Sequence, residues 1–355
     1  MTKPIKYTQP TIKKLLRGEY DTIIDVRSPI EFDEDHVPGA TNLPVLKNNE
    51  RDKVGKIYKK IGPFEARRIG ASLIAKNISV HLQTKLFDKP KNWQPLIYCW
   101  RGGHRSTAMA KIFSDIGWSS TLMDGGYKAY RKHVLDQLDK ESKKLELIVV
   151  AGLTGTAKTH ILRTSESYGC QVLDLESMAN HRGSILGREY GKPQPPQKLF
   201  ESHLYERLSM FDKKRPVFVE AESNKIGRIQ IPSALWYNMR DAKRVRVIAP
   251  IKSRISFLIK DYDHITKDPD ELIQSLSKLK RFYPRKTTEN WEKNIKLKNW
   301  ETIVSSLLEI HYDPTYIRST AERQSREILQ LQATTLKKED IIRLAEELSM
   351  LDTKR

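Results

Sequence analysis

The residues best suited to chemistry are a cysteine and an arginine that bracket a short glycine-rich loop. Cys99 begins the sequence CWRGGHR, and Arg105 ends it after five intervening residues. The apolar run Pro95–Tyr98 precedes the loop and predicts a short buried strand, and residues 106–113 have the composition of a helix. We therefore expect the loop to connect a strand to the N-terminus of a helix.

A loop in this position favours negative charge. The first N–H groups of a helix lack intrahelical partners, and with the positive end of the helix dipole they bind anions. The same field, with Arg105 nearby, is expected to favour the thiolate form of Cys99, which is the nucleophile. Most isolated cysteines only pack in a core. Here the flanking Gly102 and Gly103 favour a group carried on sulfur, and Arg101 joins these glycines as a candidate substrate contact.

A second candidate site follows the apolar run Leu145–Ala151. Residues Gly152–Thr159, GLTGTAKT, nearly match the P-loop pattern, in which backbone N–H groups surround phosphates and a lysine reaches further oxygens. The predicted phosphate or diphosphate ligands are Gly152, Gly155, Lys158 and Thr159. Ala157 stands where the second glycine of the motif belongs, and its methyl group is expected to crowd the nucleotide path or disfavour a left-handed backbone. Whether ATP binds therefore stays open.

Further polar residues follow predicted strands of this second part. Glu220 and Glu222 either hold Mg²⁺ beside the P-loop or form a polar strand end without a metal, and the sequence does not decide between the two. Asn180, His181 and Arg182 either bind a diphosphate or the target nucleotide, or fasten a loop between two strands.

Three other groups of residues are expected to be structural. Asp25 and Arg27 are predicted to form an ion pair near the Cys99 loop. Cys170, the second cysteine, is predicted to pack in a core. The aromatic residues of the C-terminal third are likewise expected to fill a helical core more readily than to stack on bases.

Composition narrows the class of protein. The 355 residues suffice for two domains, and 38% hydrophobic and 30% charged residues suit a soluble globular chain. No apolar run approaches the roughly 20 residues that span a bilayer, and residues 1–7 lack the apolar core of a signal peptide. Two cysteines make no disulfide framework, so a reducing cytoplasm is expected. The net charge of +19 favours nucleic acid as partner over a merely solubilising lysine coat.

Apolar runs alternate with helical stretches along the chain and predict an α/β fold with parallel sheets. Residues 1–138 are expected to form the domain with the Cys99 loop, residues 139–267 a P-loop α/β domain, and residues 268–355 a helical, basic region packed on the P-loop domain. The polar segment 136–144 is expected to be a linker. The apolar stripe between Ile341 and Leu351 indicates an amphipathic C-terminal helix.

The first part of the chain resembles a rhodanese-like domain. The residues that carry the resemblance are Asp25–Arg27, His36–Pro44 and the Cys99 loop. It implies a rhodanese fold in which the loop cysteine carries sulfur or selenium. The loop is one residue longer than in many sulfurtransferases and resembles that of rhodanese-fold phosphatases, although Tyr98 replaces the histidine that those phosphatases carry before the cysteine.

A rhodanese-like domain followed by a P-loop NTPase-like domain resembles the tRNA 2-selenouridine synthase family. Four further segments carry this resemblance: Gly125–Arg131, Asp174–Ser184, Glu220–Arg228 and His311–Pro314. The resemblance adds Arg228 to the candidate substrate-binding residues. It implies a transferase that acts on tRNA as a geranyltransferase and a selenotransferase.

The reaction that the resemblance implies has two steps at the wobble 2-thiouridine of tRNA. A geranyl group passes from geranyl diphosphate to the sulfur, giving S-geranyl-2-thiouridine, and selenium from selenophosphate then replaces the geranylthio group, giving 2-selenouridine. The expected partners are tRNA and these two substrates, with no tightly bound cofactor, no membrane and a monomeric state. Three alternatives stay open. They are a rhodanese-type sulfurtransferase acting on tRNA, against which the P-loop counts, a P-loop RNA kinase, against which the Cys99 loop counts, and a non-catalytic protein that binds tRNA through its charge.

Overall fold

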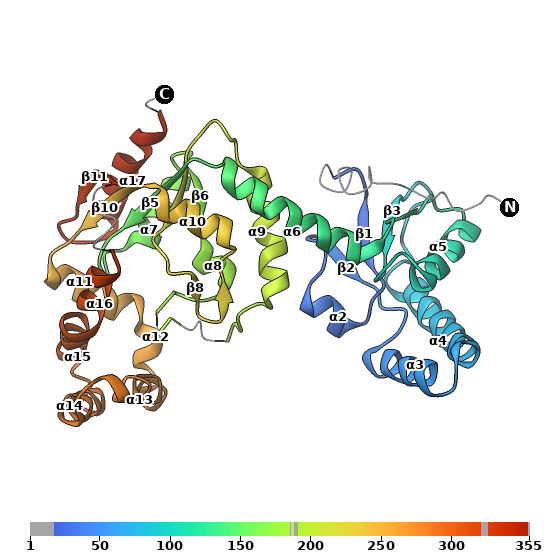
Figure 1. Ribbon diagram of the computed structural model, residues 1–355, viewed down its shortest axis with the longest axis horizontal. Helices are drawn as coiled ribbons and strands as arrows, with labels where there is room; N and C mark the ends of the chain where they lie inside the picture. The colour runs from blue at the N-terminus through green and yellow to red at the C-terminus, as the bar shows by residue number, and fades with distance from the viewer. Residues whose placement is uncertain (1–17, 185, 188–190, 321–325, 354–355) are drawn as a thin grey trace. The chain divides into compact units, whose positions relative to one another are not determined.

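The computed structural model describes residues 18–184, 186–187, 191–320 and 326–353 (Figure 1). Residues 1–7, for which the sequence predicts no signal peptide, lie outside the described residues. The start of the first predicted domain and the end of the last predicted region also lie outside them. The chain divides into two compact units. Unit 1 comprises residues 1–137 and 196–206, and unit 2 comprises residues 138–195 and 207–355.

Unit 1 is built on a four-stranded parallel sheet of order β2-β1-β3-β4. The central strand β3 is buried along its whole length, as expected where helices cover both faces of a parallel sheet. The strands are β1 (Thr22–Asp25), β2 (Ala40–Asn42), β3 (Pro95–Tyr98) and β4 (Thr121–Leu122). The helices are α2 (Pro29–Glu34), α3 (Asn48–Lys60), α4 (Pro63–Thr84), α5 (His104–Ile116) and α6 (Gly126–Lys144).

The core of unit 1 positions the helix that follows the Cys99 loop. Met109 and Phe113 lie one turn apart on α5 and are fully buried against the sheet. The ring centroid of Phe113 lies 5.1 Å from that of Trp118, which in turn lies 5.1 Å from that of Trp93. This aromatic cluster fixes the axis of α5 and therefore the direction in which its N-terminus points.

The segment 136–144 is helical rather than a linker. It forms the last turns of α6, which ends at Lys144, and the division between the two units falls within this helix. Exposed ion pairs one turn apart, such as that between Asp139 and Lys143, favour continuation of the helix. A run of charged residues thus extends the helix across the division.

Unit 2 holds a five-stranded parallel sheet of order β11-β10-β5-β7-β6, with β5 at its centre. The strands are β5 (Leu147–Ala151), β6 (Gln171–Leu173), β7 (Val217–Glu220), β10 (Lys243–Ile248) and β11 (Glu327–Gln332), beside a short antiparallel pair β8 (Lys225–Ile226) and β9 (Ile229–Gln230). The helices are α7 (Lys158–Glu166), α8 (Leu175–Ala179), α9 (Gln197–Met210), α10 (Ser233–Asp241), α11 (Ile251–Asp261) and α17 (Lys338–Thr353). Residues 196–206, which include most of α9, group with unit 1.

A group of helices completes unit 2. They are α12 (Asp263–Thr266), α13 (Pro269–Ser277), a 3₁₀ turn η1 (Lys280–Phe282), α14 (Arg285–Lys296), α15 (Trp300–Leu307), a π-helical turn η2 (Leu308–Tyr312) and α16 (Asp313–Thr320). Trp291 is buried at their centre, and its indole N–H donates to the hydroxyl of Ser306 at 2.8 Å. This aromatic residue therefore fills a helical core, as the sequence predicts.

One strand lies in the stretch for which the sequence predicts only helices. Strand β11 pairs in parallel with β10, and its residues Leu329 and Leu331 face the core while the residues between them point outward. This alternation with a period of two indicates a strand, but charged helical stretches surround it in the sequence. The apolar stripe of α17 packs on the same core as predicted, with Leu344 and Leu348 fully buried. Cys170 is buried there too.

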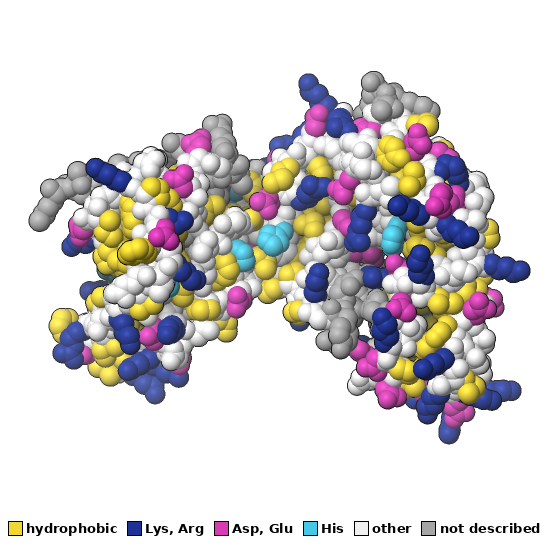
Figure 2. All heavy atoms as spheres, turned by 180° about the vertical axis from the view of Figure 1, so that it is seen from behind, with side chains coloured by type: hydrophobic (Ala, Val, Ile, Leu, Met, Phe, Trp, Pro, Cys, Tyr) yellow, Lys and Arg dark blue, Asp and Glu magenta, His cyan; other side chains and the backbone are white. Residues whose placement is uncertain are grey.

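The charges of the chain are spread over its surface. Figure 2 shows Lys and Arg side chains on both units, interspersed with Asp and Glu. Within the described residues, no helix is both long and apolar enough to cross a membrane.

The predicted ion pair between Asp25 and Arg27 is confirmed, and it is buried in unit 1. Both side chains are at most 1% exposed. The Nη2 atom of Arg27 donates to Oδ2 of Asp25 at 2.6 Å and to the carbonyl oxygen of Asp35 at 2.6 Å, and its guanidinium lies 3.9 Å from the ring centre of Tyr127. Every charge of this pair is therefore compensated where water is excluded.

Replacing Asp25→Asn is expected to lower the free energy of unfolding of unit 1 by about 3–5 kcal/mol, because it leaves the guanidinium of Arg27 buried without a counter-charge. Urea unfolding followed by circular dichroism measures this. The matched control is Asp139→Asn, which breaks an exposed pair with Lys143 and should cost less than about 1 kcal/mol. Equal effects of the two variants would contradict the structural role given to the buried pair.

Candidate functional site

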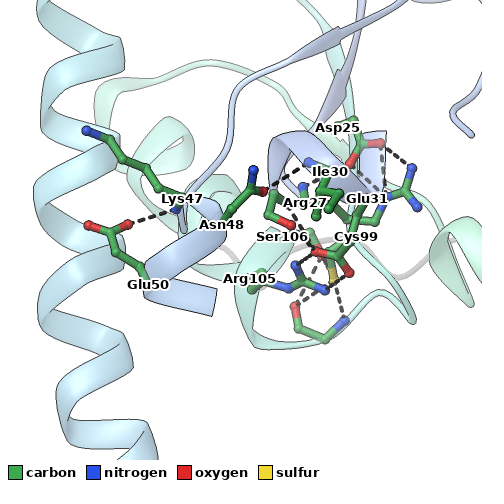
Figure 3. A network of polar contacts seen from close by, with 12 residues as sticks. Asp25, Arg27, Ile30, Glu31, Lys47, Asn48, Glu50, Cys99, Arg105 and Ser106 are labelled. Carbon is green, nitrogen blue, oxygen red and sulfur yellow. Dashed lines mark hydrogen bonds and ion pairs between the residues drawn. The ribbon is translucent and has the colours of Figure 1, made fainter. Parts of the chain in front are cut away.

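Cys99 lies directly after β3, where the chain turns into α5 (Figure 3). Its Sγ accepts a hydrogen bond from the N–H of Gly103 at 3.2 Å, and the hydroxyl of Ser106 lies 3.2 Å from the same sulfur. Both groups belong to the N-terminal end of α5, where the helix dipole favours negative charge. The thiol is 3% exposed. The arrangement therefore suits a sulfur nucleophile at the base of an anion cradle, and Ser106 is a neighbour that the sequence analysis did not select.

The N-terminus of α6 holds the Cys99 loop from the other side. The N–H groups of Tyr127 and Lys128 donate to the carbonyl oxygens of Cys99 and Trp100 at 2.9 and 3.0 Å. A Cβ atom on Gly126 would lie 2.4 Å from the carbonyl oxygen of Cys99, so only glycine permits this approach. The segment that begins at Gly125 thus serves to fix the loop.

Arg105 is mostly buried beside the loop and forms an ion pair with Glu31 of α2 at 2.6 Å. Glu31 also accepts hydrogen bonds from the N–H and the hydroxyl of Ser28. Burial alone would raise the pKa of Glu31, but the contacts with Arg105 and Ser28 lower it to about 2. The effect of Arg105 on Cys99 stays a prediction, because the positive charge of Arg105 is paired with the carboxylate of Glu31. Arg101 is exposed on the same loop.

Unit 2 contains a cleft of about 920 Å³ beyond the ends of its central strands. The structure brings most of the predicted binding residues of this unit together in its lining: Gly155, Lys158, Thr159, Asn180, Arg182, Glu220 and Glu222. Three predicted residues do not line it. Gly152 lies at the base of the P-loop, where its N–H donates to the hydroxyl of Tyr316 at 2.9 Å. The N–H of His181 donates to the carbonyl oxygen of Glu176, and Arg228 donates to that of Gln194 at 2.6 Å.

The alanine of the P-loop does not prevent the turn into α7. Ala157, the residue before α7, has a φ of 58°, which is left-handed. A non-glycine residue in this region costs roughly 1–2 kcal/mol, and the burial of the methyl group in the core offsets part of that cost. The methyl group therefore disfavours the left-handed backbone, as predicted, without preventing it. A Cβ atom on Gly155 would lie 2.7 Å from Cδ1 of Leu258, so α11 packs directly on the loop.

A buried arginine that the sequence analysis missed braces the P-loop. Arg254 of α11 is 3% exposed, and its Nε donates to the carbonyl oxygen of Thr154 at 2.8 Å. Its two terminal nitrogens donate to the carboxylate of Asp313 at 2.9 and 2.6 Å. The sequence offered one indication of this contact, because Asp313 lies in the segment His311–Pro314 that carries the family resemblance. Its partner Arg254 is far away in the sequence, and only the fold joins them.

Three carboxylates meet beside the P-loop. Oxygens of Glu176, Glu220 and Glu222 lie within 4.8 Å of one another. Burial, together with the charge of Glu220, raises the pKa of Glu176 to about 10 and that of Glu222 to about 8. Thr159 donates to Glu220 at 2.6 Å, and Nζ of Lys158 lies 3.4 Å from it. Burial alone would lower the pKa of Lys158, but Glu220, Tyr316, Glu176 and Glu222 together outweigh it and the pKa is raised.

This cluster fits a divalent cation. Carboxylate and hydroxyl oxygens are the ligands that Mg²⁺ prefers. The raised pKa values of Glu176 and Glu222 indicate that the negative charges of the cluster are not fully compensated by the residues around them. The metal site at Glu220 and Glu222 stays a prediction, which this arrangement of oxygens fits. Glu176 lies on the short helix α8, in the segment Asp174–Ser184 that carries the family resemblance, but it was not among the residues predicted to bind a ligand.

The residues Asn180 to Arg182 fasten a loop, and two of them line the cleft, where binding of a ligand stays a prediction. Asn180 has a φ of 47° and donates to the carbonyl oxygen of Pro193 at 3.2 Å, which fastens the loop. Arg182 lines the cleft, forms an ion pair with Asp261 at 2.7 Å, and lies 4.7 Å from the ring centre of Tyr262. The arginine is thus held with its charge at the edge of the cleft.

Replacing Glu176→Gln is expected to raise the Tm by a few degrees at pH 8 and to change it little at pH 5, in buffer free of divalent cations. The folded pKa of about 10 lies above the unfolded value of 4.5, so the folded chain keeps a proton that the unfolded chain releases, and stability falls as the pH rises between these values. Differential scanning calorimetry measures this, with the exposed Glu346→Gln as control. If the Tm of the Glu176→Gln variant at pH 8 equals or falls below the wild-type value, the carboxylate of Glu176 is not destabilised by burial and by the charge of Glu220.

Comparison with known proteins matches both units to families. Residues 8–133 match the rhodanese-like domain, and residues 145–282 match the domain described as "tRNA 2-selenouridine synthase AAA domain". The rhodanese-like resemblance and the fold class predicted from the sequence, a rhodanese-like domain followed by a P-loop α/β domain, are thereby confirmed.

Relatives described as tRNA 2-selenouridine synthase match over most of the chain. The one from Nitrosomonas europaea is 35% identical over 68% of this chain and 63% of its own length, so the chain spans less than two thirds of that relative. The one from Bdellovibrio bacteriovorus is 34% identical over 73% of this chain and 69% of its own length. The one from Shewanella woodyi is 30% identical over 86% of this chain and 90% of its own length. With a cysteine loop and a P-loop intact on one chain, this protein belongs to the tRNA 2-selenouridine synthase family.

Proposed function

We propose that this chain converts 2-thiouridine at the wobble position of tRNA into 2-selenouridine. The observation that carries the proposal is the presence, on one chain of this family, of two separate anion sites, the Cys99 loop and the P-loop cleft. Two sites suit two donors that each bear phosphorus oxyanions, selenophosphate and geranyl diphosphate. The net charge of +19 suits a polyanionic acceptor such as tRNA.

The P-loop cleft suits the first step, transfer of the geranyl group. The sulfur of 2-thiouridine forms a bond to the first carbon of the geranyl chain, the bond from that carbon to the diphosphate oxygen breaks, and the base releases its N–H proton to solvent. The diphosphate leaves with developing negative charge. Lys158 and the N–H groups of the P-loop are placed to stabilise that charge. Ala157, in place of the second glycine of the motif, leaves ATP binding open. Because this step hydrolyses no nucleotide, Ala157 is compatible with it.

A divalent cation fits the same step. Thr159, Glu220 and Glu176 would hold Mg²⁺ beside Lys158, and the ion would supply neutralisation of the leaving diphosphate. Without the ion, Lys158 is the positive group closest to Glu220 in the described part of the cleft.

The Cys99 loop suits the second step, exchange of the geranylthio group for selenium. A bond forms between selenium and the second carbon of the base, the bond from that carbon to sulfur breaks, geranylthiol leaves, and the phosphoryl group of selenophosphate passes to water. Selenium enters and ends at the same oxidation level, so the step needs no oxidant. We assign Cys99, between the N–H of Gly103 and the hydroxyl of Ser106, as the nucleophile of this step. Its sulfur forms a bond to the second carbon of the base as geranylthiol leaves, and selenium then displaces Cys99 from that carbon, which restores the free cysteine.

Replacing Cys99→Ser is expected to abolish selenation and to preserve geranyl transfer, because a serine hydroxyl is a much poorer nucleophile than the sulfur of cysteine. Intact mass spectrometry of tRNA that carries 2-thiouridine, first with geranyl diphosphate and then with selenophosphate, follows both steps. The matched control is Cys170→Ser in the core of unit 2, which should retain both. Loss of both steps in a folded Cys99→Ser variant would refute the division between the two sites.

Replacing Lys158→Ala is expected to slow geranyl transfer about 10²–10³-fold, because the developing charge on the diphosphate loses its cation. Selenation of tRNA that is already geranylated should continue at the wild-type rate. The exposed Lys252→Ala on α11 is the control. The assay is run with Mg²⁺ and with a chelator, and wild-type transfer that persists fully in the chelator would exclude the proposed cation. Unchanged kinetics in Lys158→Ala would refute the role of the P-loop.

A further inference from the structure

Unit 2 contains a second cavity that neither the P-loop nor the carboxylates explain. It has a volume of about 80 Å³, and its walls consist almost entirely of carbon atoms. They come from helices α11, α13 and α15 and from the turn η2, through side chains that include Leu258, Leu272, Val304 and Leu308. An apolar cavity of this kind offers no hydrogen bonds to a sugar, a phosphate or the edge of a base.

This cavity adjoins the P-loop cleft. Five residues line both, namely Thr154, Ser184, Leu258, Tyr262 and Tyr312. Thr154 belongs to the P-loop itself, and Leu258 is the side chain that packs on Gly155. The apolar cavity therefore borders the phosphate cradle. Apart from the shared residues, its lining includes Thr266, whose hydroxyl donates to the carbonyl oxygen of Asp263.

The helices around the cavity present more apolar surface than their own core uses. On α15, Ile303 and Leu307 belong to the helical core around Trp291 and also line the cavity. Val304 on α15 and Leu308 at the start of η2 widen this apolar stripe. Leu308 begins the π-helical turn η2, which ends at Tyr312 on the rim. Such turns occur frequently at functional sites, because the extra residue redirects the side chains that follow. Figure 1 shows α11 and α15 side by side, which agrees with this lining.

We propose that this cavity binds the hydrocarbon chain of a prenyl diphosphate whose diphosphate lies in the P-loop. The inference rests on the proposed function, because that function supplies a substrate with a charged end and an apolar end. A nucleoside triphosphate has no such apolar end, since its base and ribose carry polar groups that these walls leave without partners. The occupant is therefore a branched hydrocarbon chain, and Val304 and Leu308 determine how much of it is accepted.

Isothermal titration calorimetry with the full chain and no tRNA tests this, using inorganic diphosphate and geranyl diphosphate as probes. We expect wild type to bind geranyl diphosphate at least about 100-fold more tightly than inorganic diphosphate, since each buried methylene adds to the affinity. Val304→Trp fills the cavity and should reduce the affinity for geranyl diphosphate at least about tenfold, with that for inorganic diphosphate unchanged. The matched control is Thr302→Trp on the exposed face of α15, which should behave as wild type.

The outcomes separate this inference from the proposed function. Equal affinity of wild type for the two probes would refute binding of the hydrocarbon chain in the cavity, but it would not refute binding of diphosphate in the P-loop. If neither probe binds, both the proposed diphosphate site in the P-loop and the proposed prenyl site in the cavity are refuted. Val304→Ala, which enlarges the cavity and is tolerated more readily than tryptophan, provides a second test if Val304→Trp does not fold. It should shift the preference from geranyl towards farnesyl diphosphate, and an unchanged preference would overturn the inference.

Discussion

Each unit of this chain places its candidate chemistry where a buried parallel strand gives way to a helix N-terminus. The backbone N–H groups at that point have no partners within the helix, and the helix dipole adds positive potential. In unit 1 the strand is β3, and the group held there is the sulfur of Cys99. In unit 2 the strand is β5, and the P-loop leads into α7. Both sites therefore depend on the same backbone feature, with different side chains added to it.

Neither loop is held by its own sequence alone. The amide groups at the start of α6 secure the Cys99 loop, and the pair of Arg254 and Asp313 secures the P-loop through the carbonyl oxygen of Thr154. Buried charge is accepted in both units because each charged group meets a partner, as Arg27 meets Asp25. The carboxylate cluster of unit 2 is the exception. Its like charges are crowded, which is why a cation and a diphosphate suit the same cleft.

The P-loop cleft and the apolar cavity give unit 2 two adjoining chemical environments. Lysine, threonine and carboxylates line the first, and carbon atoms line the second. A ligand that spans both must carry charge at one end and hydrocarbon at the other. Leu258 contributes to both surfaces, because α11 passes between the P-loop and the helices that follow it. The helical part of unit 2 is thus part of the proposed binding site as well as of the fold.

The sequence by itself determined the fold class, both loops and most of the cleft, because strand, turn and helix signals are local and the residues of each motif are adjacent. It also determined that Asp25 pairs with Arg27, two positions apart. Only the tertiary structure decided what joins distant segments. It brought Glu176 to Glu220, Arg254 to Asp313, and strand β11 to the edge of β10. These contacts arise from packing, which no local pattern records, and for the same reason the apolar cavity became visible only once the helices were in place.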